Sequence, residues 1–305
     1  MTTTTLGFGT APLGGLYETI PEYQAVATVT YALEHGIAFF DTAPHYGAGL
    51  SEKRLGLALA GVPRDSFVLA SKVGRLVDEA TERTYFDFSR EGILRSIDAS
   101  LSRLRVDRID ILHVHDPDAH LGIALREAFP VIEQLRSEGV IRGVGVGTNH
   151  WEVALTCVRE APLDCLLLAG RYTLLEQAGA LDQLFPACSK IGVKVFLGGI
   201  YNSGILATGA VPGARYNYVE PDADTVSKVM ALEEQCRQHG IALSDAAVQF
   251  PAAHPAVTTL IAGMRSVEEV DSFIAATQVE IPPEFWQDLV TSGLIDANAP
   301  LPIVK

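Results

Sequence analysis

Short apolar runs alternate with amphipathic segments along almost the whole chain. The apolar runs are nearly continuous in hydrophobicity, as expected of parallel strands that are covered on both faces. Eight runs of strand length cover residues 5–10, 36–42, 66–72, 108–115, 141–147, 163–170, 193–199 and 257–263. Helical periodicity marks residues 23–36, 51–61, 90–104, 125–139, 151–160, 223–240 and 266–276. This alternation predicts an α/β fold of the (β/α)8 TIM-barrel type, with a doubly wound sheet as the main alternative.

No linker, low-complexity segment or short repeat divides the chain, so residues 1–305 are predicted to form one barrel domain. Residues 212–224 are rich in proline, glycine and acidic residues and are expected to form a long loop. The segment after Pro282 is expected to be a tail that packs over the barrel.

The composition argues against several classes of partner. The net charge of −14 would repel a nucleic-acid backbone. The first residues do not resemble a secretory signal, and no apolar run approaches the roughly 20 residues that cross a bilayer, so we expect no membrane partner and a cytoplasmic location. Four cysteines are scattered along the chain, which favours buried, reduced thiols over a disulfide framework or a zinc site: Cys157, Cys165, Cys188 and Cys236.

Polar side chains follow the ends of consecutive predicted strands. Asp41 ends one strand and Tyr46 follows it in a glycine-bearing loop, while Lys72 and His115 end the next two strands. Each has an ordinary structural explanation when taken alone: a turn former, a half-buried aromatic ring, a solvated strand end and a core histidine. Because chemistry in a barrel sits at the carboxyl ends of the strands, the four together predict one catalytic site.

Several motifs at this site resemble those of the aldo-keto reductase family. The matching stretches are GFGT (7–10), FFDTAPHYGAGLSEKRLG (39–56), ASK (70–72), IDILHVHDP (109–117), GVGVGTN (143–149) and IAGMRSVEEV (261–270). The resemblance spans essentially the whole chain and implies a barrel that binds a nicotinamide cofactor without a Rossmann domain. It also implies a catalytic tetrad of Asp41, Tyr46, Lys72 and His115. His115 is preferred to His113 because the family histidine lies two residues before a proline.

The tetrad residues suit proton transfer to and from a substrate oxygen. A free tyrosine has a pKa of about 10, and the Lys72 ammonium is expected to lower that value for Tyr46. Asp41 would keep Lys72 charged and oriented, and His115 would hold the substrate oxygen by a hydrogen bond. Tyr46 would then donate a proton during carbonyl reduction and accept one during alcohol oxidation.

The family resemblance also implies cofactor contacts. Thr148 and Asn149 fall where the family holds the nicotinamide carboxamide, and the sequence YNSGIL (201–206) falls where it contacts the pyrophosphate. The full predicted set is Gly9, Thr10, Thr148, Asn149, Asn202, Ser203, Gly204, Leu206, Gly263, Arg265 and Glu269. The residues usually found in the segments FLGGIYN and LLLAGRY, an aromatic residue and a glutamine, are replaced here.

The adenosine end predicts NAD as the cofactor, with NADP as the alternative. A carboxylate at Glu269, beside Glu268, would repel a 2′-phosphate, whereas Arg265 could still bind one. The competing explanation is that both glutamates favour the first turn of a helix.

Further stretches resemble a branch of the family that oxidises cyclic hemiacetal sugars of the L-fucose, L-galactose or D-arabinose type to lactones. Oxidation of pyridoxal and general aldehyde reduction are the alternatives within the family. Polar or aromatic residues that could contact such a substrate are Asp116, Tyr201 and Trp151, with His120 and Arg171 as further candidates.

Two other classes of protein stay open. The first is a metal-dependent barrel hydrolase, in which the H-x-H pair of His113 and His115 could bind a metal together with His150, although we expect no metal. The second is a non-catalytic protein that senses a cofactor.

Overall fold

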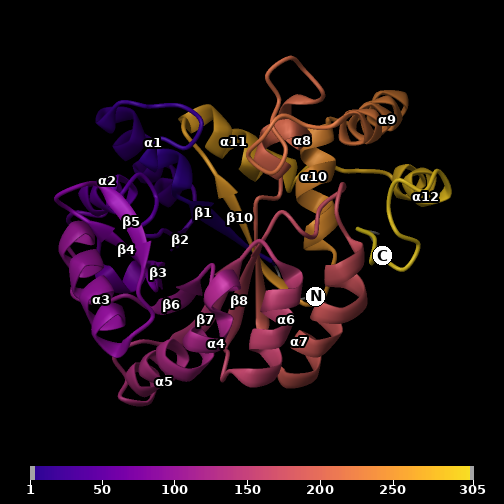
Figure 1. Ribbon diagram of the computed structural model, residues 1–305. Helices are drawn as coiled ribbons and strands as arrows, with labels where there is room; N and C mark the ends of the chain where they lie inside the picture. Colours follow the sequence, from indigo (N-terminus) through magenta and orange to yellow (C-terminus); the bar gives the residue numbers. More distant parts are fainter. Residues whose placement is uncertain (1–3, 303–305) are drawn as a thin grey trace.

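Eight parallel strands close into a barrel in the computed structural model, which describes residues 4–302 (Figure 1). In order around the barrel they are β1 (Thr5–Gly9), β10 (Val257–Gly263), β9 (Lys194–Gly198), β8 (Cys165–Ala169), β7 (Gly143–Thr148), β6 (Ile111–His115), β3 (Val68–Val73) and β2 (Phe39–Asp41). Strand β1 pairs with both β10 and β2, so the sheet has no edge. The predicted TIM barrel is therefore confirmed, and the doubly wound sheet is excluded because that sheet stays open.

Helices surround the barrel (Figure 1). They are α1 (Glu22–Glu34), α2 (Leu50–Ala58), α3 (Arg90–Leu104), α4 (Leu121–Ile123), α5 (Phe129–Ser137), α6 (Trp151–Glu160), α7 (Phe185–Ile191), α8 (Ile205–Thr208), α9 (Ala223–His239), α10 (Leu243–Ala252), α11 (Val267–Ala276) and α12 (Pro283–Thr291). Side-chain caps fix several helix starts: the oxygens of Ser89, Asp222 and Ser266 accept backbone N–H groups of α3, α9 and α11. A large core fills the space between strands and helices, and a smaller cluster that includes Phe39 and Phe196 fills the barrel interior.

Several elements depart from the sequence expectations. An antiparallel hairpin of β4 (Arg75–Asp78) and β5 (Arg83–Phe86) follows β3; each strand has only four residues, and neither was predicted. Helices α7 and α10 were not predicted, because a π-helical turn (Ala180–Leu184) interrupts the periodicity before α7, and Pro251 lies inside α10. The segment after Pro282, expected as a tail that packs over the barrel, contains a helix, α12, which packs against α9. The predicted loop lacks regular helix up to residue 222; α9 begins at Ala223, so the last two residues of the predicted loop are helical.

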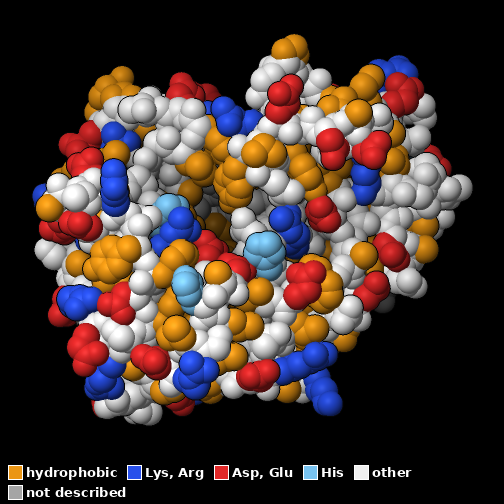
Figure 2. All heavy atoms as spheres, in the orientation of Figure 1, with side chains coloured by type: hydrophobic (Ala, Val, Ile, Leu, Met, Phe, Trp, Pro, Cys, Tyr) orange, Lys and Arg blue, Asp and Glu red, His pale blue; other side chains and the backbone are white. Residues whose placement is uncertain are grey.

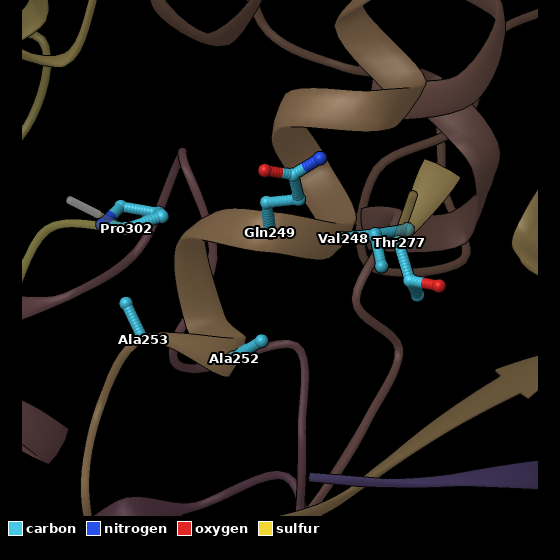
Figure 3. A pocket seen from close by; sticks show the side chains of 6 residues that line it. All are labelled: Val248, Gln249, Ala252, Ala253, Thr277 and Pro302. Atoms are coloured by element: carbon cyan, nitrogen blue, oxygen red, sulfur yellow. The ribbon is translucent and has the colours of Figure 1, made fainter. Parts of the chain in front are cut away.

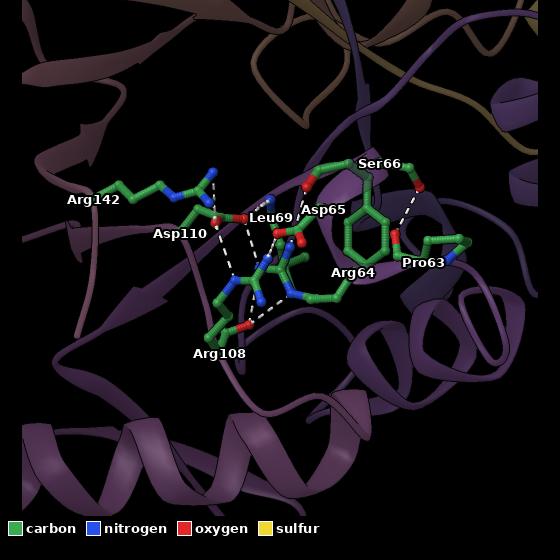
Figure 4. Close-up of polar contacts among 9 residues, drawn as sticks. Pro63, Arg64, Asp65, Ser66, Leu69, Arg108, Asp110 and Arg142 are labelled. Atoms are coloured by element: carbon green, nitrogen blue, oxygen red, sulfur yellow. Dashed lines mark hydrogen bonds and ion pairs between the residues drawn. The ribbon is translucent and has the colours of Figure 1, made fainter. Parts of the chain in front are cut away.

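A polar cluster joins the amino-terminal ends of β3 and β6 (Figure 4). The buried Asp110 carboxylate accepts hydrogen bonds from Arg64 Nη2 at 2.6 Å and from the Leu69 backbone N–H at 2.8 Å. Arg142 Nη1 lies 3.5 Å from the other carboxylate oxygen. Polar groups at this end of a barrel stabilise the fold, whereas the opposite end carries the chemistry.

The space-filling view shows a hollow near the centre of the face seen in Figure 2, with histidine, basic and acidic side chains around it. All four cysteines are buried and unpaired, as predicted. Among the helices within residues 4–302, none combines the length and the apolar character that crossing a membrane requires.

Candidate active site

A buried ion pair links the ends of β2 and β3. Lys72 Nζ donates to Asp41 Oδ2 at 2.6 Å and to the Thr42 carbonyl oxygen at 2.9 Å. The two side chains are only 2% and 4% exposed. Burial alone would lower the pKa of Lys72, but the Asp41 carboxylate and Tyr46 together raise it above its usual value. Lys72 is therefore a fixed ammonium inside the barrel mouth.

Tyr46 lies against this ammonium. Lys72 Nζ is 4.7 Å from the centroid of the Tyr46 ring. Two glycines hold the loop in place: Gly47 has a φ of +60°, and a Cβ on it would lie 2.2 Å from the Gly14 carbonyl oxygen. The loop after β1 can approach the tyrosine loop this closely only because neither glycine carries a side chain. The glycines around Tyr46 thus serve packing as well as turn formation.

His115 completes the tetrad from the end of β6. Its ring is nearly perpendicular to that of Tyr46, at 89°, with the centroids 6.0 Å apart. Burial, assisted by the Lys72 charge, lowers the pKa of His115 well below its ordinary value. His115 is therefore a neutral imidazole near pH 7, able to donate one hydrogen bond. The structure thus brings together all four predicted tetrad residues.

The protonation of Tyr46 differs from the expectation. Burial raises the pKa of Tyr46 to about 12, and the Lys72 ammonium only partly offsets that effect. Lys72 does lower the pKa of Tyr46, as predicted, but burial has the larger effect and the net shift is upward. Removing the Tyr46 phenolate from water costs more free energy than the Lys72 ammonium returns, because that ammonium is already paired with Asp41.

Two of the predicted cofactor residues make structural hydrogen bonds. The Thr10 hydroxyl, at the end of β1, is fully buried; it donates to the Asp41 carbonyl at 3.0 Å and accepts from Ser51 Oγ at 2.7 Å. The Thr148 hydroxyl, at the end of β7, donates to Asp118 Oδ1 at 2.9 Å. Neighbouring Gly9 and Asn149 are partly exposed. These residues lie at strand ends at the same mouth as the tetrad.

The predicted pyrophosphate segment has an unusual backbone. Asn202 and Ser203 both adopt left-handed conformations, with φ values of +44° and +61°, ahead of Gly204. Non-glycine residues in this region are strained and are concentrated at ligand-binding loops. The Asn202 amide donates to the Gly170 carbonyl at 3.2 Å, while its buried Oδ1 has no partner within residues 4–302. An orphaned acceptor fits a ligand that donates a hydrogen bond, such as a hydroxyl or amide group of a bound cofactor, and not a phosphate oxygen. Leu206 is also buried.

At the adenosine end, Arg265 is already engaged by two carboxylates. Its Nη2 and Nε donate to Glu269 Oε1 at 2.6 and 3.1 Å, and its Nη1 donates to Glu18 Oε2 at 3.0 Å. Glu269 also accepts the Arg265 backbone N–H at 2.6 Å. Gly263 ends β10 where a Cβ would lie 2.9 Å from Pro12, so this strand end packs closely on the loop after β1.

The candidate substrate residues are spread more widely. Asp116 lies beside the tetrad, with its Oδ2 at 3.5 Å from His115 Nε2. Tyr201 is half-buried next to Asn202, and Trp151 packs its indole on Gly179.

The two further candidates lie on loops. The His120 ring lies 5.1 and 5.8 Å from the rings of Phe86 and Phe88. Arg171 donates to Asn217 at 2.9 Å. Of the candidate substrate residues, Asp116 lies against the tetrad, through its contact with His115.

Two neighbours of the tetrad were missed from the sequence. The His45 ring lies 6.0 Å from the His115 ring, and its Nδ1 is 3.2 Å from Thr84 Oγ1 in the hairpin. Arg75 Nη1 donates to Asp116 Oδ2 at 3.1 Å. His45 stands one residue before Tyr46, so its position in the motif was an available signal. No comparable sequence signal marked Arg75, because the hairpin that positions it was not predicted.

The metal-site alternative has no assembled ligand set. In the part of the chain that the structure describes, no three histidine, cysteine, aspartate or glutamate side chains are grouped as a metal ion would require. His113 is fully buried in the barrel interior, edge-on to Phe196 at 6.1 Å. Burial lowers its pKa to about 3, so it is a neutral core histidine.

A cavity of about 200 Å³ lies away from the tetrad, beside α10 (Figure 3). Its lining is mostly small or apolar: Val248, Gln249, Ala252, Ala253, Thr277 and Pro302. It contains no acid, base or nucleophile, so it offers no chemistry to compare with that of the barrel mouth.

Comparison with known proteins agrees with this geometry. The model of the Aldo/keto reductase family matches residues 5–292. A D-threo-aldose 1-dehydrogenase from a Pseudomonas species is 37% identical, over 95% of this chain and 94% of that protein. A pyridoxal 4-dehydrogenase from Microbacterium luteolum is 36% identical, over 97% and 95%. Among solved structures, the holo form of an aldo-keto reductase from Bacillus halodurans has a TM-score of 0.79 at 27% identity, covering 96% of this chain and 92% of its own.

Proposed function

The chain belongs to the aldo/keto reductase family, and on that premise we propose that it oxidises C1 of a cyclic hemiacetal aldose to a lactone. The observation that carries the proposal is the group of Asp41, Tyr46, Lys72 and His115 at one barrel mouth, around the 2.6 Å ion pair. The similarity to an aldose 1-dehydrogenase supports the choice of a sugar of the L-fucose, L-galactose or D-arabinose type.

Members of this family use NAD(P), and this chain does the same. Bound oxidised nicotinamide supplies the hydride acceptor and a positive charge. The strand-end residues Thr148 and Asn149 are proposed to hold its carboxamide, and the strained loop at Asn202 and Ser203 to contact the pyrophosphate. Gly263, Arg265 and Glu269 would then face the adenosine.

In the proposed reaction Tyr46 accepts the C1 hydroxyl proton while the C1 hydrogen leaves as hydride. The C–H and O–H bonds break, the C=O bond of the lactone forms, and the two electrons pass to the nicotinamide. His115, as a neutral donor, holds the reacting oxygen, and Lys72 stabilises the phenolate that accepts the proton. Because the pKa of Tyr46 is about 12 before ligands bind, the positive charge of the cofactor would assist its ionisation.

We infer a preference for NAD over NADP from the adenosine end. The Arg265 guanidinium is bound by Glu269 and Glu18, so it is not free to pair with a 2′-phosphate. With the adenosine bound at this end, the Glu269 carboxylate would repel that phosphate.

Oxidation of pyridoxal is a second candidate function. It is supported by the similarity to a pyridoxal 4-dehydrogenase, which is nearly as strong as that to the aldose enzyme. The same tetrad could serve this substrate, since pyridoxal also forms a cyclic hemiacetal that oxidises to a lactone.

A substrate screen tests the proposal directly. The protein would be incubated with L-fucose, L-galactose, D-arabinose or pyridoxal, and reduction of NAD and of NADP followed separately by absorbance. Lactone would be identified by mass spectrometry before it hydrolyses. We expect sugar-dependent reduction of NAD. Activity confined to open-chain aldehydes with reduced cofactor would replace the proposal with a general aldehyde reductase.

A further inference from the structure

The hairpin after β3 carries Arg75 to the barrel mouth. Gly74 makes the turn with a φ of +89°, and a Cβ there would lie 2.2 Å from the Phe88 ring, so only glycine fits. Arg75 is therefore placed three residues after Lys72, at the start of β4. Its guanidinium carbon lies 5.2 Å from the centroid of the Phe86 ring, which pairs with it across the hairpin. This cation–π contact holds one face of the guanidinium.

Asp116 meets Arg75 from the other side. Arg75 Nη1 donates to Asp116 Oδ2 at 3.1 Å, and the same oxygen lies 3.5 Å from His115 Nε2. The backbone of Asp116 is left-handed, with a φ of +43°, and its N–H donates to the Gly147 carbonyl at 2.9 Å. Positive φ is uncommon for a non-glycine residue, although aspartate adopts it more readily than most, and here it fixes the position of Asp116 directly after His115.

Arg75 and Asp116 both have donor or acceptor atoms that form no hydrogen bond within the protein. Within residues 4–302, Nε and Nη2 of Arg75 and Oδ1 of Asp116 form no hydrogen bond to other residues. The side chains are 25% and 30% exposed, so a ligand in the mouth can reach them. Donors and an acceptor placed side by side match two adjacent hydroxyl groups, because each hydroxyl both donates and accepts.

We propose that Arg75 and Asp116 bind the hydroxyls on C2 and C3 of the aldose and so determine which substrates the site accepts. The inference rests on the proposed function, since it takes C1 as the reacting carbon. In that function His115 holds the C1 oxygen. A hydroxyl one carbon further on would then lie close to Asp116, whose carboxylate is 3.5 Å from the histidine. Substrates without a neighbouring hydroxyl would leave the pair partly unsatisfied.

The test compares L-fucose with 2-deoxy-L-fucose, which lacks the C2 hydroxyl. In the wild-type protein kcat/KM should favour L-fucose by roughly 10- to 150-fold, the range for a hydrogen bond to a charged group. Arg75→Met keeps an apolar stem on Phe86 but removes the donors, and should lower the ratio of the two kcat/KM values clearly below that of the wild type. Asp116→Asn should also lower the ratio. Arg83→Met, an exposed position at the far end of the same hairpin, is the matched control and should leave the ratio unchanged.

The specificity ratio separates recognition from a structural role. If Arg75→Met lowers kcat/KM for both sugars by the same factor, or leaves the ratio at the wild-type value, the inference is wrong. Arg75→Lys keeps the charge beside Phe86 but loses the planar fork, so it provides a second test if the methionine variant does not fold. An unchanged ratio in that variant also overturns the inference. A wild-type protein that oxidises no aldose overturns the proposed function, and this inference with it.

Discussion

Removing Lys72 should destabilise the protein much more than its lost packing explains. In Lys72→Met the Asp41 carboxylate stays buried without its counter-ion, and one of its oxygens already lacks a hydrogen bond within residues 4–302. Breaking one partner of a buried pair costs about 3–5 kcal/mol of unfolding free energy. Asp41→Leu should cost a similar amount, because it leaves the buried Lys72 ammonium with the Thr42 carbonyl alone.

The double variant Asp41→Leu/Lys72→Met should recover most of that stability. No unpaired charge remains, and replacing a buried ion pair by apolar side chains of similar volume is often neutral or favourable by about 1–4 kcal/mol. The unpartnered Thr42 carbonyl subtracts about 1–3 kcal/mol from this gain. We therefore expect the double variant within about 2 kcal/mol of wild type and catalytically inactive.

Urea unfolding followed by circular dichroism measures all four proteins under the same conditions. The deficit of Lys72→Met should also shrink as the pH falls. Burial raises the pKa of folded Asp41, and Lys72 opposes that effect, so the pKa should be higher still in Lys72→Met. Protonation at lower pH then stabilises the folded variant more than the folded wild type, and this benefit is lost as the pH rises through the folded pKa. A double variant as unstable as the sum of the single variants would refute the reasoning. Such a result would show that the Asp41–Lys72 ion pair is retained because it stabilises the fold. We infer instead that it is retained for catalysis.

The barrel could be predicted because its strands are short, apolar and covered on both sides. The elements that the sequence did not reveal are those in which local periodicity is weak. Helix α7 follows a π-helical turn that shifts the register of its apolar face, and the hairpin strands β4 and β5 are only four residues long and largely unburied. Such elements are specified by contacts with the finished barrel, and these contacts cannot be read from neighbouring residues.

The tetrad could be predicted because strand ends in a barrel converge on one mouth. The residues that tune it could not all be found in that way. Arg75 reaches Asp116 through the unpredicted hairpin, and Glu18 reaches Arg265 from a loop 247 positions away in the sequence. The direction of the Tyr46 pKa shift also depended on burial, which a list of neighbouring charges does not contain.

Three further outcomes follow from the site. Tyr46→Phe should lower kcat by roughly 10²–10⁴-fold with cofactor affinity, measured by fluorescence titration, nearly unchanged, because the ring remains and only the proton carrier is lost. In the wild-type protein kcat for oxidation should rise as the pH increases, since burial sets the pKa of Tyr46 at about 12 and only the phenolate accepts a proton; a flat kcat–pH profile would contradict this assignment. At the adenosine end, Glu269→Arg should narrow the preference for NAD over NADP in kcat/KM, because it replaces a carboxylate that binds Arg265 with a second guanidinium able to pair with the 2′-phosphate. Glu268→Arg is the matched control, because it makes the same change in net charge at an exposed neighbouring position in the first turn of α11. If both variants change the cofactor preference equally, Glu269 acts only through its charge and not through a specific contact.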